Sequence, residues 1–337
     1  MSTRIDHYEK MIFDGEANSL CKIGERIYVC ANTGETGYIH LFEVDANGNL
    51  SLSLSQSYVH TVKRITTDGN RLYAVSDLDG VTKIIRAFDP VDLAPIGNTY
   101  NMGDSIYGPI HASTAGFVLA AKEWIAGVSY DNTRLLRFDG AAFMEITRFP
   151  ARLAYQVIGL RIVSVVISST LMGYLYYLGV DRSIEIAVNL PLVTGSDIAS
   201  KGVAIVSETR IAIAEANRLV LYSVPAGEIL DSVSYSMSGM GRMVTDGRYV
   251  YLTSAVAPNI VAYDTYDDEL RYTDSASFPS EEVGLSDINN QNIVYGSNKL
   301  FVLSDSGLHS FTKSLAADFT ISNPTPAVGE TVTFEVI

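Results

Sequence analysis

The sequence predicts an all-β fold: a seven-bladed β-propeller closed by an N-terminal strand in the last blade, plus a truncated immunoglobulin-like segment. Three observations support this prediction. Strands rich in β-branched and aromatic residues recur at a near-constant spacing, Gly-containing turns separate them, and the composition changes near the C-terminus. We divide the chain into a propeller at residues 1–314 and the first strands of an immunoglobulin-like domain at residues 315–337.

The repeating unit is clearest at Thr66–Pro90, TTDGNRLYAVSDLDGVTKIIRAFDP. A Thr-Asp-Gly turn leads into an alternating strand at Arg71–Val75, a polar Asp/Gly loop follows, and a second strand at Lys83–Phe88 ends in Asp-Pro. Asp-Gly pairs supply the backbone conformations that tight hairpin turns require. The unit therefore predicts a β-hairpin.

This hairpin unit recurs along the chain. The first apolar residue of its leading strand, which is the second strand of a blade, is Ile27, Leu72, Phe117, Ile162, Ile211, Val250 and Leu300. The first four of these residues are 45 residues apart, and the later gaps are 49, 39 and 50. Four short strands with a period of about 40–50 residues are typical of a propeller blade. Seven such units therefore predict seven blades.

Two further strands follow in most units. The predicted third strands are Tyr38–Val44, Lys83–Phe88, Arg134–Phe138, Tyr174–Leu178, Arg218–Val224, Ile260–Tyr263 and Leu308–Thr312. The predicted fourth strands, which are more polar, are Leu50–Ser57, Phe143–Phe149, Ile184–Asn189, Ile229–Tyr235 and Leu270–Phe278. Inner strands are expected to be almost wholly apolar because both of their faces press on neighbouring blades, whereas an outer strand is half solvated.

The two ends of the propeller predict how the ring closes. The last unit, Gly284–Lys313, has only three strands, and the alternating segment Ile5–Phe13 belongs to no other unit. We expect residues 5–13 to form the outer strand of the last blade. This pairing would leave no open blade edge between the first and last units.

Two stretches carry a family resemblance: IYVCANTG…IHLFEVD within Ile27–Asp45, and LYAVSD…IIRAFDP within Leu72–Pro90. Each has a Tyr-containing strand, a small polar turn and a strand that ends in Asp. The units resemble the YVTN/lactonase-like superfamily of seven-bladed propellers over most of the chain. The Trp-Asp pairs of WD repeats and the Asp boxes of sialidases are absent from the sequence.

The tail Ala317–Ile337, ADFTISNPTPAVGETVTFEVI, has a strand, an Asn-Pro-Thr-Pro stretch, Gly-Glu and a Thr/Val-rich strand. It resembles the opening two strands of the PKD-type immunoglobulin-like domain. Because a complete sandwich needs about 100 residues, the resemblance implies that the natural protein continues. The alternative is a tail that packs on the propeller.

Composition argues against several partners and compartments. The formal net charge is −14 with only 24 Lys+Arg and no basic run, which argues against nucleic acid as a partner. The start, MSTRIDHYEKMIFDGE, lacks the apolar core of a secretion signal. Cys21 and Cys30 are the only cysteines, and we expect two buried free thiols, with a bridge between them as the alternative.

One uncharged segment, Ile162–Val180, is long enough to span a bilayer as a helix. However, Ser168, Ser169 and Thr170 interrupt it, and its Val, Ile and Tyr residues favour strands. It also falls in phase with the repeat. We therefore expect strands here and no membrane insertion.

The sequence predicts no catalytic residues, no cofactor and no metal. The histidines lie far apart, and neither H-E-x-x-H nor G-x-S-x-G occurs. His111 falls on a predicted innermost strand, where we expect a structural residue, packed or lining the central channel. The alternating oxygens of Asp45, Asn47 and Asn49 suit calcium or a tight turn, and the acids of Tyr263–Glu269 suit calcium or a solvated connection. We expect a tight turn at Asp45–Asn49 and a solvated connection at Tyr263–Glu269.

The candidate ligand-binding residues are predicted to share one face of the ring. That face carries three predicted connections, Lys122–Thr133, Tyr100–Pro109 and Ser236–Met243. Aromatic rings beside a planar cation suit glycan stacking or a protein contact, whereas the alternative is a tryptophan that covers the core beneath its loop. The candidate residues are Trp124, the only tryptophan, with Tyr130, Tyr107 and Arg242.

These observations favour a non-enzymatic, surface-exposed module for assembly or adhesion. We expect a virion tail or decoration protein that binds other virion or surface-layer proteins, or a host glycan or receptor. Such a protein reaches the outside by lysis and needs no export signal. One alternative is a secreted or cell-surface prokaryotic propeller. The other is a lactonase- or glycan-lyase-like enzyme, a family whose members use His, Arg and Glu at the channel mouth, for which His111 and Arg242 are the residues to test.

Overall fold

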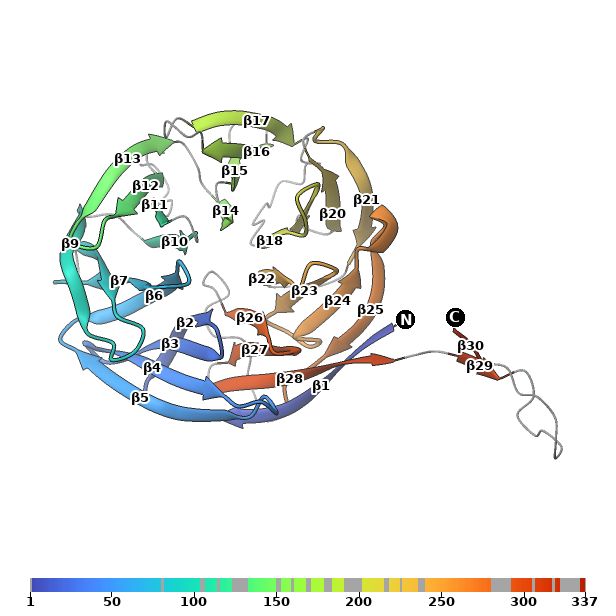
Figure 1. Cartoon of the computed structure of the whole chain (residues 1–337), viewed down its shortest axis with the longest axis horizontal. Helices are drawn as coiled ribbons and strands as arrows, with labels where there is room; N and C mark the ends of the chain where they lie inside the picture. The colour runs from blue at the N-terminus through green and yellow to red at the C-terminus, as the bar shows by residue number, and fades with distance from the viewer. Residues whose placement is uncertain are drawn as a thin grey trace.

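The computed structural model describes residues 2–79, 82–103, 107–113, 116–122, 133–149, 153–158, 161–167, 171–178, 184–190, 202–214, 218–224, 226–235, 240–279, 292–304, 307–316, 319–321 and 334–336. Within these residues, the strands form seven four-stranded antiparallel sheets and one two-stranded sheet. Figure 1 shows the seven larger sheets following one another around a central space. In each of them, one strand lies next to that space and one lies at the rim.

Six of these sheets are made of strands in chain order from the centre outward. Their innermost strands are β2 (Glu16–Ile23), β6 (Thr61–Thr67), β10 (Tyr107–Ala112), β14 (Leu153–Ile158), β18 (Gly202–Ile205) and β22 (Met240–Thr245). The second strands are β3 (Arg26–Thr33), β7 (Leu72–Asp77), β11 (Phe117–Lys122), β15 (Arg161–Ile167), β19 (Arg210–Ala214) and β23 (Tyr249–Ser254). The third strands are β4 (Thr36–Val44), β8 (Lys83–Phe88), β12 (Thr133–Phe138), β16 (Leu171–Leu178), β20 (Arg218–Ser223) and β24 (Ile260–Asp264). The outer strands are β5 (Leu50–Tyr58), β9 (Pro95–Gly103), β13 (Phe143–Phe149), β17 (Ile184–Leu190), β21 (Ile229–Ser234) and β25 (Arg271–Ala276), and the short 3₁₀ helix η1 (Tyr266–Asp268) precedes β25.

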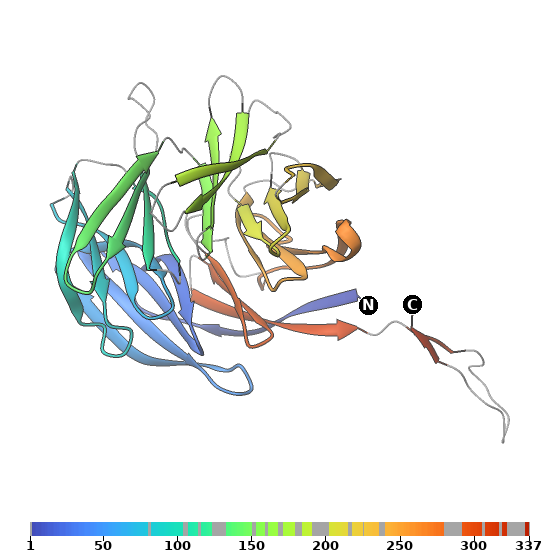
Figure 2. The same ribbon diagram turned by 45° about the horizontal axis from the view of Figure 1, so that its top comes forward.

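The remaining four-stranded sheet contains both ends of the ring-forming chain. It consists of β26 (Ile293–Gly296), β27 (Lys299–Ser304), β28 (Gly307–Ala316) and β1 (Ser2–Met11), in that order. β1 and β28 are antiparallel, with Ile5 opposite Lys313 and Met11 opposite Leu308. Figure 2 shows β1 running along β28 at the rim. The alternating N-terminal segment therefore pairs with the third strand of the last unit.

The buried and exposed positions follow the expected division between inner and outer strands. Every residue of β23 and β27 is buried, whereas β5 exposes most of its side chains. Apolar clusters form between neighbouring sheets: one joins Leu219 and Leu221 of one sheet to Leu252 and Tyr263 of the next. Adjacent sheets therefore pack face to face, and these contacts hold the ring together.

The segment with the length of a membrane helix forms two strands instead. β15 and β16 pair antiparallel, with Arg161 opposite Tyr177 and Ile167 opposite Leu171. In the part of the chain that the structure describes, no helix is both long and apolar enough to cross a bilayer.

Three sequence predictions need correction. The fourth strand of the second unit, β9, was given no bounds because Pro95, Gly97 and Gly103 interrupt its pattern, and its end at Gly103 lies in the predicted connection Tyr100–Pro109. Tyr107 is the first residue of β10, and Arg242 lies within β22, so neither lies in a loop as predicted.

The C-terminal residues form a separate element. β29 (Phe319–Ile321) pairs antiparallel with β30 (Phe334–Val336). Figures 1 and 2 both place this pair beyond the ring, after β28. The likeness to a PKD-type domain remains a prediction.

Candidate functional site

One cavity of the described part of the chain lies where the innermost strands meet. Its volume is about 320 Å³. That volume lies at the lower end of the range for small-molecule sites, about 300–1,000 Å³, so the cavity suits a small ligand rather than a polymer. Six innermost strands contribute to the described lining, which consists of Leu20, Cys21, Lys22, Ile65, Thr66, Thr67, Ile110, His111, Ala112, Val203, Arg242, Met243, Val244, Thr245, Val294 and Tyr295.

The strand register shows which of these residues are equivalent. In each of six sheets, one inner-strand residue lies opposite the third residue of the predicted second strand, as His111 lies opposite Leu119 and Met243 opposite Leu252. The six equivalent residues are Leu20, Ile65, His111, Val203, Met243 and Ile293. His111 is the one polar side chain among these six.

The positions immediately before those six are more polar. They are occupied by Ser19, Arg64, Ile110, Gly202, Arg242 and Asn292. Arg64 and Arg242 are 6% and 7% exposed, and Asn292 is fully buried. Arg64 and Arg242 therefore occupy equivalent positions in two different sheets, one residue before the position that corresponds to His111.

The described lining of the cavity carries more positive than negative charge. Its described lining contains Lys22 and Arg242 but neither aspartate nor glutamate, although the whole chain has a net charge of −14. Burial, and then the positive charges of Arg242 and Arg64, lower the pKa of His111 to about 3. His111 is therefore neutral at physiological pH. A neutral imidazole donates one hydrogen bond and accepts one.

Arg242 and Asn292 are joined through a neighbouring hydroxyl group. The Thr253 Oγ1 lies 3.0 Å from the carbonyl oxygen of Arg242 and 3.2 Å from Oδ1 of Asn292. The buried Nδ2 of Asn292 has no hydrogen-bond partner within the described residues. The amide therefore presents an unused donor close to the Arg242 backbone.

The structure brings together only part of the predicted site. Trp124 and Tyr130 fall outside the described residues, and of Tyr107 the structure describes only the backbone. Arg242 instead joins His111 in the cavity wall. Arg64 was not predicted as a site residue, although its position before Ile65 matches that of Arg242 before Met243 in the inner-strand register.

Both cysteines are free and buried, as predicted. Burial, reinforced by the neighbouring Cys30, raises the pKa of the Cys21 thiol well above its ordinary value. Burial also raises the pKa of Cys30 to about 12. Because the thiolate is the nucleophilic form, neither thiol is activated for chemistry at neutral pH.

The Thr-Asp-Gly turns of the repeat form the same hydrogen-bonded structure twice. In the turn after β6, Oδ1 of Asp68 accepts the backbone N–H groups of Asn70 and Arg71, each at 2.8 Å, and Oδ2 accepts the hydroxyl of Tyr73 at 2.6 Å. The Thr67 Oγ1 accepts the N–H of Gly69 at 2.9 Å. Gly69 has a φ of +93°, a region that favours glycine. The turn therefore depends on its Asp, Thr and Gly together.

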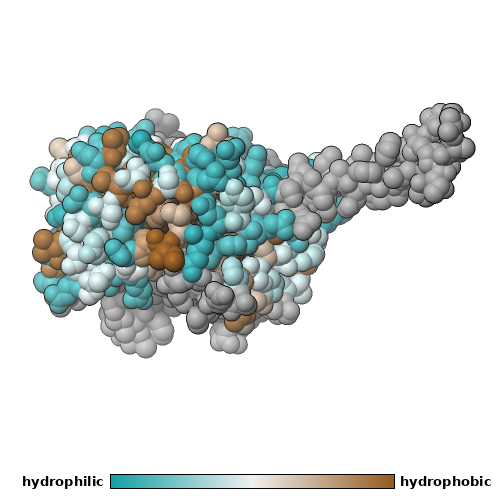
Figure 3. Space-filling model, turned by 90° about the horizontal axis from the view of Figure 1, so that it is seen from below, coloured by the Kyte–Doolittle hydropathy of each residue, from teal (hydrophilic) through white to brown (hydrophobic). Residues whose placement is uncertain are grey.

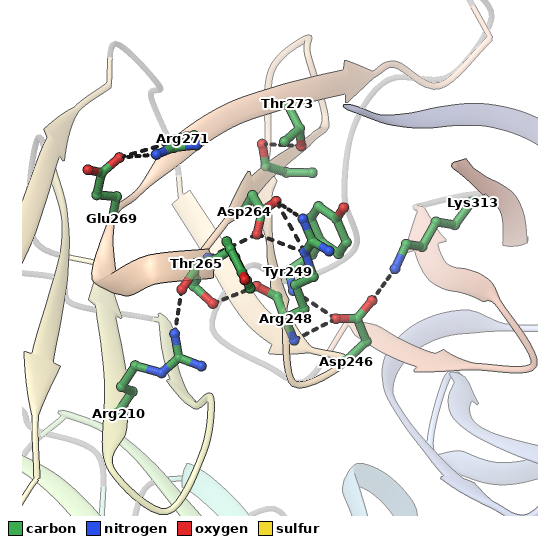
Figure 4. A network of polar contacts seen from close by, with 12 residues as sticks. Arg210, Asp246, Arg248, Tyr249, Asp264, Thr265, Glu269, Arg271, Thr273 and Lys313 are labelled. Carbon is green, nitrogen blue, oxygen red and sulfur yellow. Dashed lines mark hydrogen bonds and ion pairs between the residues drawn. The ribbon is translucent and has the colours of Figure 1, made fainter. Parts of the chain in front are cut away.

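The turn after β22 repeats these bonds and adds a lysine. Asp246 accepts the N–H groups of Arg248 and Tyr249 and the hydroxyl of Tyr251, at 3.0, 2.7 and 2.9 Å. It also forms a short ion pair with Lys313 of β28, and the two side chains are 7% and 11% exposed. The Lys313 Nζ lies 4.2 Å from the ring centroid of Tyr249, which adds a cation–π contact. Figure 4 shows Lys313 reaching Asp246 from the neighbouring sheet.

The acid-rich segment Tyr263–Glu269 is balanced by arginines, as Figure 4 also shows. Arg248 pairs with Asp264 at 2.6 Å, and Arg271 pairs with Glu269 at 2.5 Å. Within the described residues, no cluster of three or more His, Cys, Asp or Glu could hold a metal ion. This segment is a salt-bridged connection at the rim.

The Asp45 loop is a tight turn. Oδ1 of Asp45 accepts the backbone N–H groups of Asn47 and Asn49 at 2.8 and 2.7 Å, and Oδ2 accepts the side-chain amide of Asn49 at 2.7 Å. These bonds, led by those from Asn49, lower the pKa of Asp45. The carboxylate oxygens are thus used by the turn itself.

Comparison with known proteins supports the fold. No family model and no curated protein sequence matches the chain. Among solved structures, the chain is similar to the WD40 β-propeller domain of Doa1, with a TM-score of 0.63 and 10% identity over 93% of this chain and 97% of that one. It is also similar to the computationally designed protein Ika8, with a TM-score of 0.58 and 11% identity over 91% of this chain and 99% of that one. At these identities the likeness concerns the fold alone, which is that of a β-propeller.

Proposed function

We propose that the protein is a non-enzymatic interaction platform, in which seven sheets act as the blades of a closed propeller and the loops of one face bind a partner. In an antiparallel blade, the turn between the second and third strands shares a face with the link to the next blade. Four exposed apolar side chains lie in such segments of that face. They are Ile12, Val59, Leu78 and Val256, which are 73%, 85%, 41% and 50% exposed.

The exposure of these four apolar side chains on loops of one face is the observation that carries the proposal. Apolar side chains on the loops of a rigid scaffold are suited to a protein contact. Figure 3, which shows another side of the molecule, has apolar atoms gathered within a mostly hydrophilic surface. The predicted loop Lys122–Thr133, with Trp124 and Tyr130, lies between β11 and β12, the second and third strands of their sheet, but residues 123–132 are outside the described part of the chain.

Within this role we propose a virion tail or decoration protein that binds other virion or surface-layer proteins, a host glycan or a receptor. A net charge of −14 supports a partner other than nucleic acid. The C-terminal pair β29–β30, placed beyond the ring, supports attachment to a further module. A secreted or cell-surface prokaryotic protein would use the same face.

The test compares two faces of the molecule. A variant with Ile12→Ser, Val59→Ser, Leu78→Ser and Val256→Ser is compared with one that carries Val91→Ser, Met144→Ser, Ile229→Ser and Tyr266→Ser on the opposite face. Both are assayed for co-purification with the products of adjacent genes and for binding on a glycan array, together with Trp124→Ala. Loss confined to the first set and Trp124→Ala supports the proposal. Equal binding by all variants contradicts it.

A second candidate is a lactonase- or glycan-lyase-like enzyme, which the joint presence of His111 and Arg242 in the cavity wall favours. The glutamate that the family resemblance implies is not among the described lining residues. Turnover of a lactone panel by the wild-type protein and its loss in His111→Gln would support this candidate. No turnover by the wild-type protein would remove it.

A further inference from the structure

Each of the seven four-stranded sheets ends at the rim in an outer strand, which pairs with a neighbouring strand on one side only. The other edge of such a strand is a row of backbone N–H and C=O groups that can pair with a further strand. Proteins protect these edges with charged side chains, prolines, bulges or a covering segment. The outer strands differ in how many of these devices they have.

Six of the seven outer strands carry a device that β5 lacks. Each of β1, β13, β17, β21 and β25 contains at least one aspartate or glutamate. β9 has no charged residue, but it contains Pro95 and two glycines. The backbone N–H of Asn98 in β9 also donates to the carbonyl oxygen of Ala141, in the connection between β12 and β13, at 2.7 Å. The neighbouring sheet therefore covers part of the β9 edge.

β5 has the sequence LSLSLSQSY, with no charged residue, no proline and no glycine, and six of its nine residues are exposed. At its start, the N–H of Leu50 donates to Oε2 of Glu9 at 2.9 Å. At its end, the hydroxyl of Tyr58 donates to the carbonyl oxygen of Leu93 at 2.7 Å. These contacts fix the two ends of the strand and leave most of the residues between them exposed.

A bulge does not distinguish β5 from the other outer strands. The pairing of every outer strand with its neighbour in the sheet contains one or two such irregularities. Among the outer strands that the structure describes, β5 is therefore the least protected edge, and it is nine residues long.

Charge indicates which strand fits this edge. A cationic strand would be matched better by the outer strands that contain carboxylates, whereas the uncharged β5 edge suits an uncharged strand. The exposed, uncharged strand available in the molecule is β5 itself. Two chains that each carry a net charge of −14 repel one another over most of their surfaces, but two β5 strands can pair without a like-charge contact between them.

We propose that two copies of the chain associate by antiparallel pairing of their β5 strands about a two-fold axis near Leu54, the middle residue of the strand. The pairing joins two four-stranded sheets into one and places Leu52 of one copy opposite Gln56 of the other. Because two strands make a small interface, we expect a dissociation constant on the order of 10 μM. This interface lies at the rim and does not depend on the proposed interaction face.

Sedimentation velocity between about 1 and 200 μM protein tests the proposal, and we expect the wild-type protein to change from monomer to dimer over this range. The double variant Leu52→Lys with Gln56→Lys brings like charges together in the pair and should weaken the dimer about tenfold or more. The matched control is Ile229→Lys on β21, because Ile229 is 41% exposed and Leu52 is 45% exposed. It should leave the dissociation constant within about twofold.

A charge-swap experiment shows whether β5 pairs with β5. The variant Leu52→Glu with Gln56→Glu should also be monomeric alone, whereas an equal mixture with the lysine variant should form a heterodimer, since position 52 of each copy faces position 56 of the other. Thermal unfolding of each variant checks that these exposed substitutions preserve the fold. A wild-type protein that stays monomeric at all concentrations overturns the proposal. A dimer that the lysine variant does not weaken, or a mixture that does not associate, also overturns it.

Discussion

The turns at Asp68 and Asp246 share a sequence and a hydrogen-bond pattern but differ in what they hold together. Asp68 closes a local hairpin: within the described residues, its carboxylate accepts hydrogen bonds from groups no more than five residues away. Asp246 does the same and in addition binds Lys313, which is 67 residues away on β28. A local turn of the repeat thus also forms a long-range clamp, an ion pair between sheets, where a lysine of the neighbouring sheet reaches its carboxylate.

The position of Lys313 explains why this clamp matters. Lys313 lies opposite Ile5 of β1 in the sheet that joins both ends of the ring-forming chain. Tyr249, Tyr251 and Tyr295 surround its ammonium group at 4.2, 5.9 and 5.7 Å from their ring centroids. The Asp246 turn thus ties the preceding sheet to the sheet where the N-terminal strand pairs.

The largest expected effect is that of Asp246→Ala. This substitution leaves the buried ammonium of Lys313 without its carboxylate, and breaking a buried ion pair costs about 3–5 kcal/mol. Asp68→Ala removes only hydrogen bonds within its turn and should cost about 2 kcal/mol. Urea denaturation of both variants measures the difference in the free energy of unfolding. Equal losses would mean that the clamp adds nothing to the turn.

A double-mutant cycle separates the clamp from the turn. We expect Asp246→Ala and Lys313→Met to be coupled by about 1–3 kcal/mol, because the two groups are in direct contact. Asp68→Ala combined with Lys313→Met should be additive within about 0.5 kcal/mol. Coupling of similar size in both pairs would contradict the distinction between the two turns.

Acid should weaken the Asp246 turn in a defined pH range. Burial opposes ionisation of Asp246, but hydrogen bonds from Lys313 and from the amides of Tyr249 and Arg248 outweigh it, so its pKa is lowered from 3.8. A carboxylate with a lowered folded-state pKa contributes stability that is fully present above its unfolded value and is lost as the pH falls through the folded value. The free energy of unfolding of wild type should therefore fall below about pH 4, and Asp246→Asn should reduce that fall.

His111 provides the control for that titration. Its folded-state pKa of about 3 lies below the ordinary 6.5, so its contribution is present above pH 6.5 and is lost as the pH falls toward 3. The loss amounts to at most about 1.4 kcal/mol per pH unit. His111→Gln should flatten the stability curve between pH 6.5 and pH 4 and leave the Asp246 part unchanged. A curve that His111→Gln does not alter in that range would contradict the burial of a neutral imidazole.

Much of the fold could be predicted because the repeat consists of short segments rich in strand-forming residues. All seven predicted second-strand positions fall inside observed strands, since these central strands are almost wholly apolar. The bounds of the outer strand β9 could not be predicted because about half of its residues are exposed and it contains Pro and Gly. It therefore lacks the pattern of apolar residues that marks a buried strand. The N-terminal strand could be found because its alternation belongs to no other unit.

The cavity could not be predicted in the same way. Its residues come from six strands that are far apart in sequence, and each contributes between one and four residues that form no motif in their own strand. Arg242 was assigned to a loop because Gly239 and Gly241 flank Met240 in the sequence, a pattern typical of turns. Arg64 and Arg242 are seen to be equivalent only from the residue pairs between the first and second strands of each sheet. Those pairs cannot be assigned from the sequence alone.

The smallest expected effect tests whether the two turns are otherwise the same. Thr67 and Thr245 make matching bonds: their hydroxyls donate to the carbonyls of Arg71 and Tyr249 at 2.7 and 2.8 Å and accept from Gly69 and Gly247 at 2.9 and 3.0 Å. Thr67→Val and Thr245→Val should each cost about 1 kcal/mol, because each loses a similar pair of partly exposed hydrogen bonds. Lys313 contacts Asp246 and not Thr245, so the ion pair should not change the free energy that the threonine hydrogen bonds contribute to the turn. Thermal unfolding of the two variants should therefore give matching shifts, and a clearly larger shift for Thr245→Val would show that the clamp also strains or supports the turn itself.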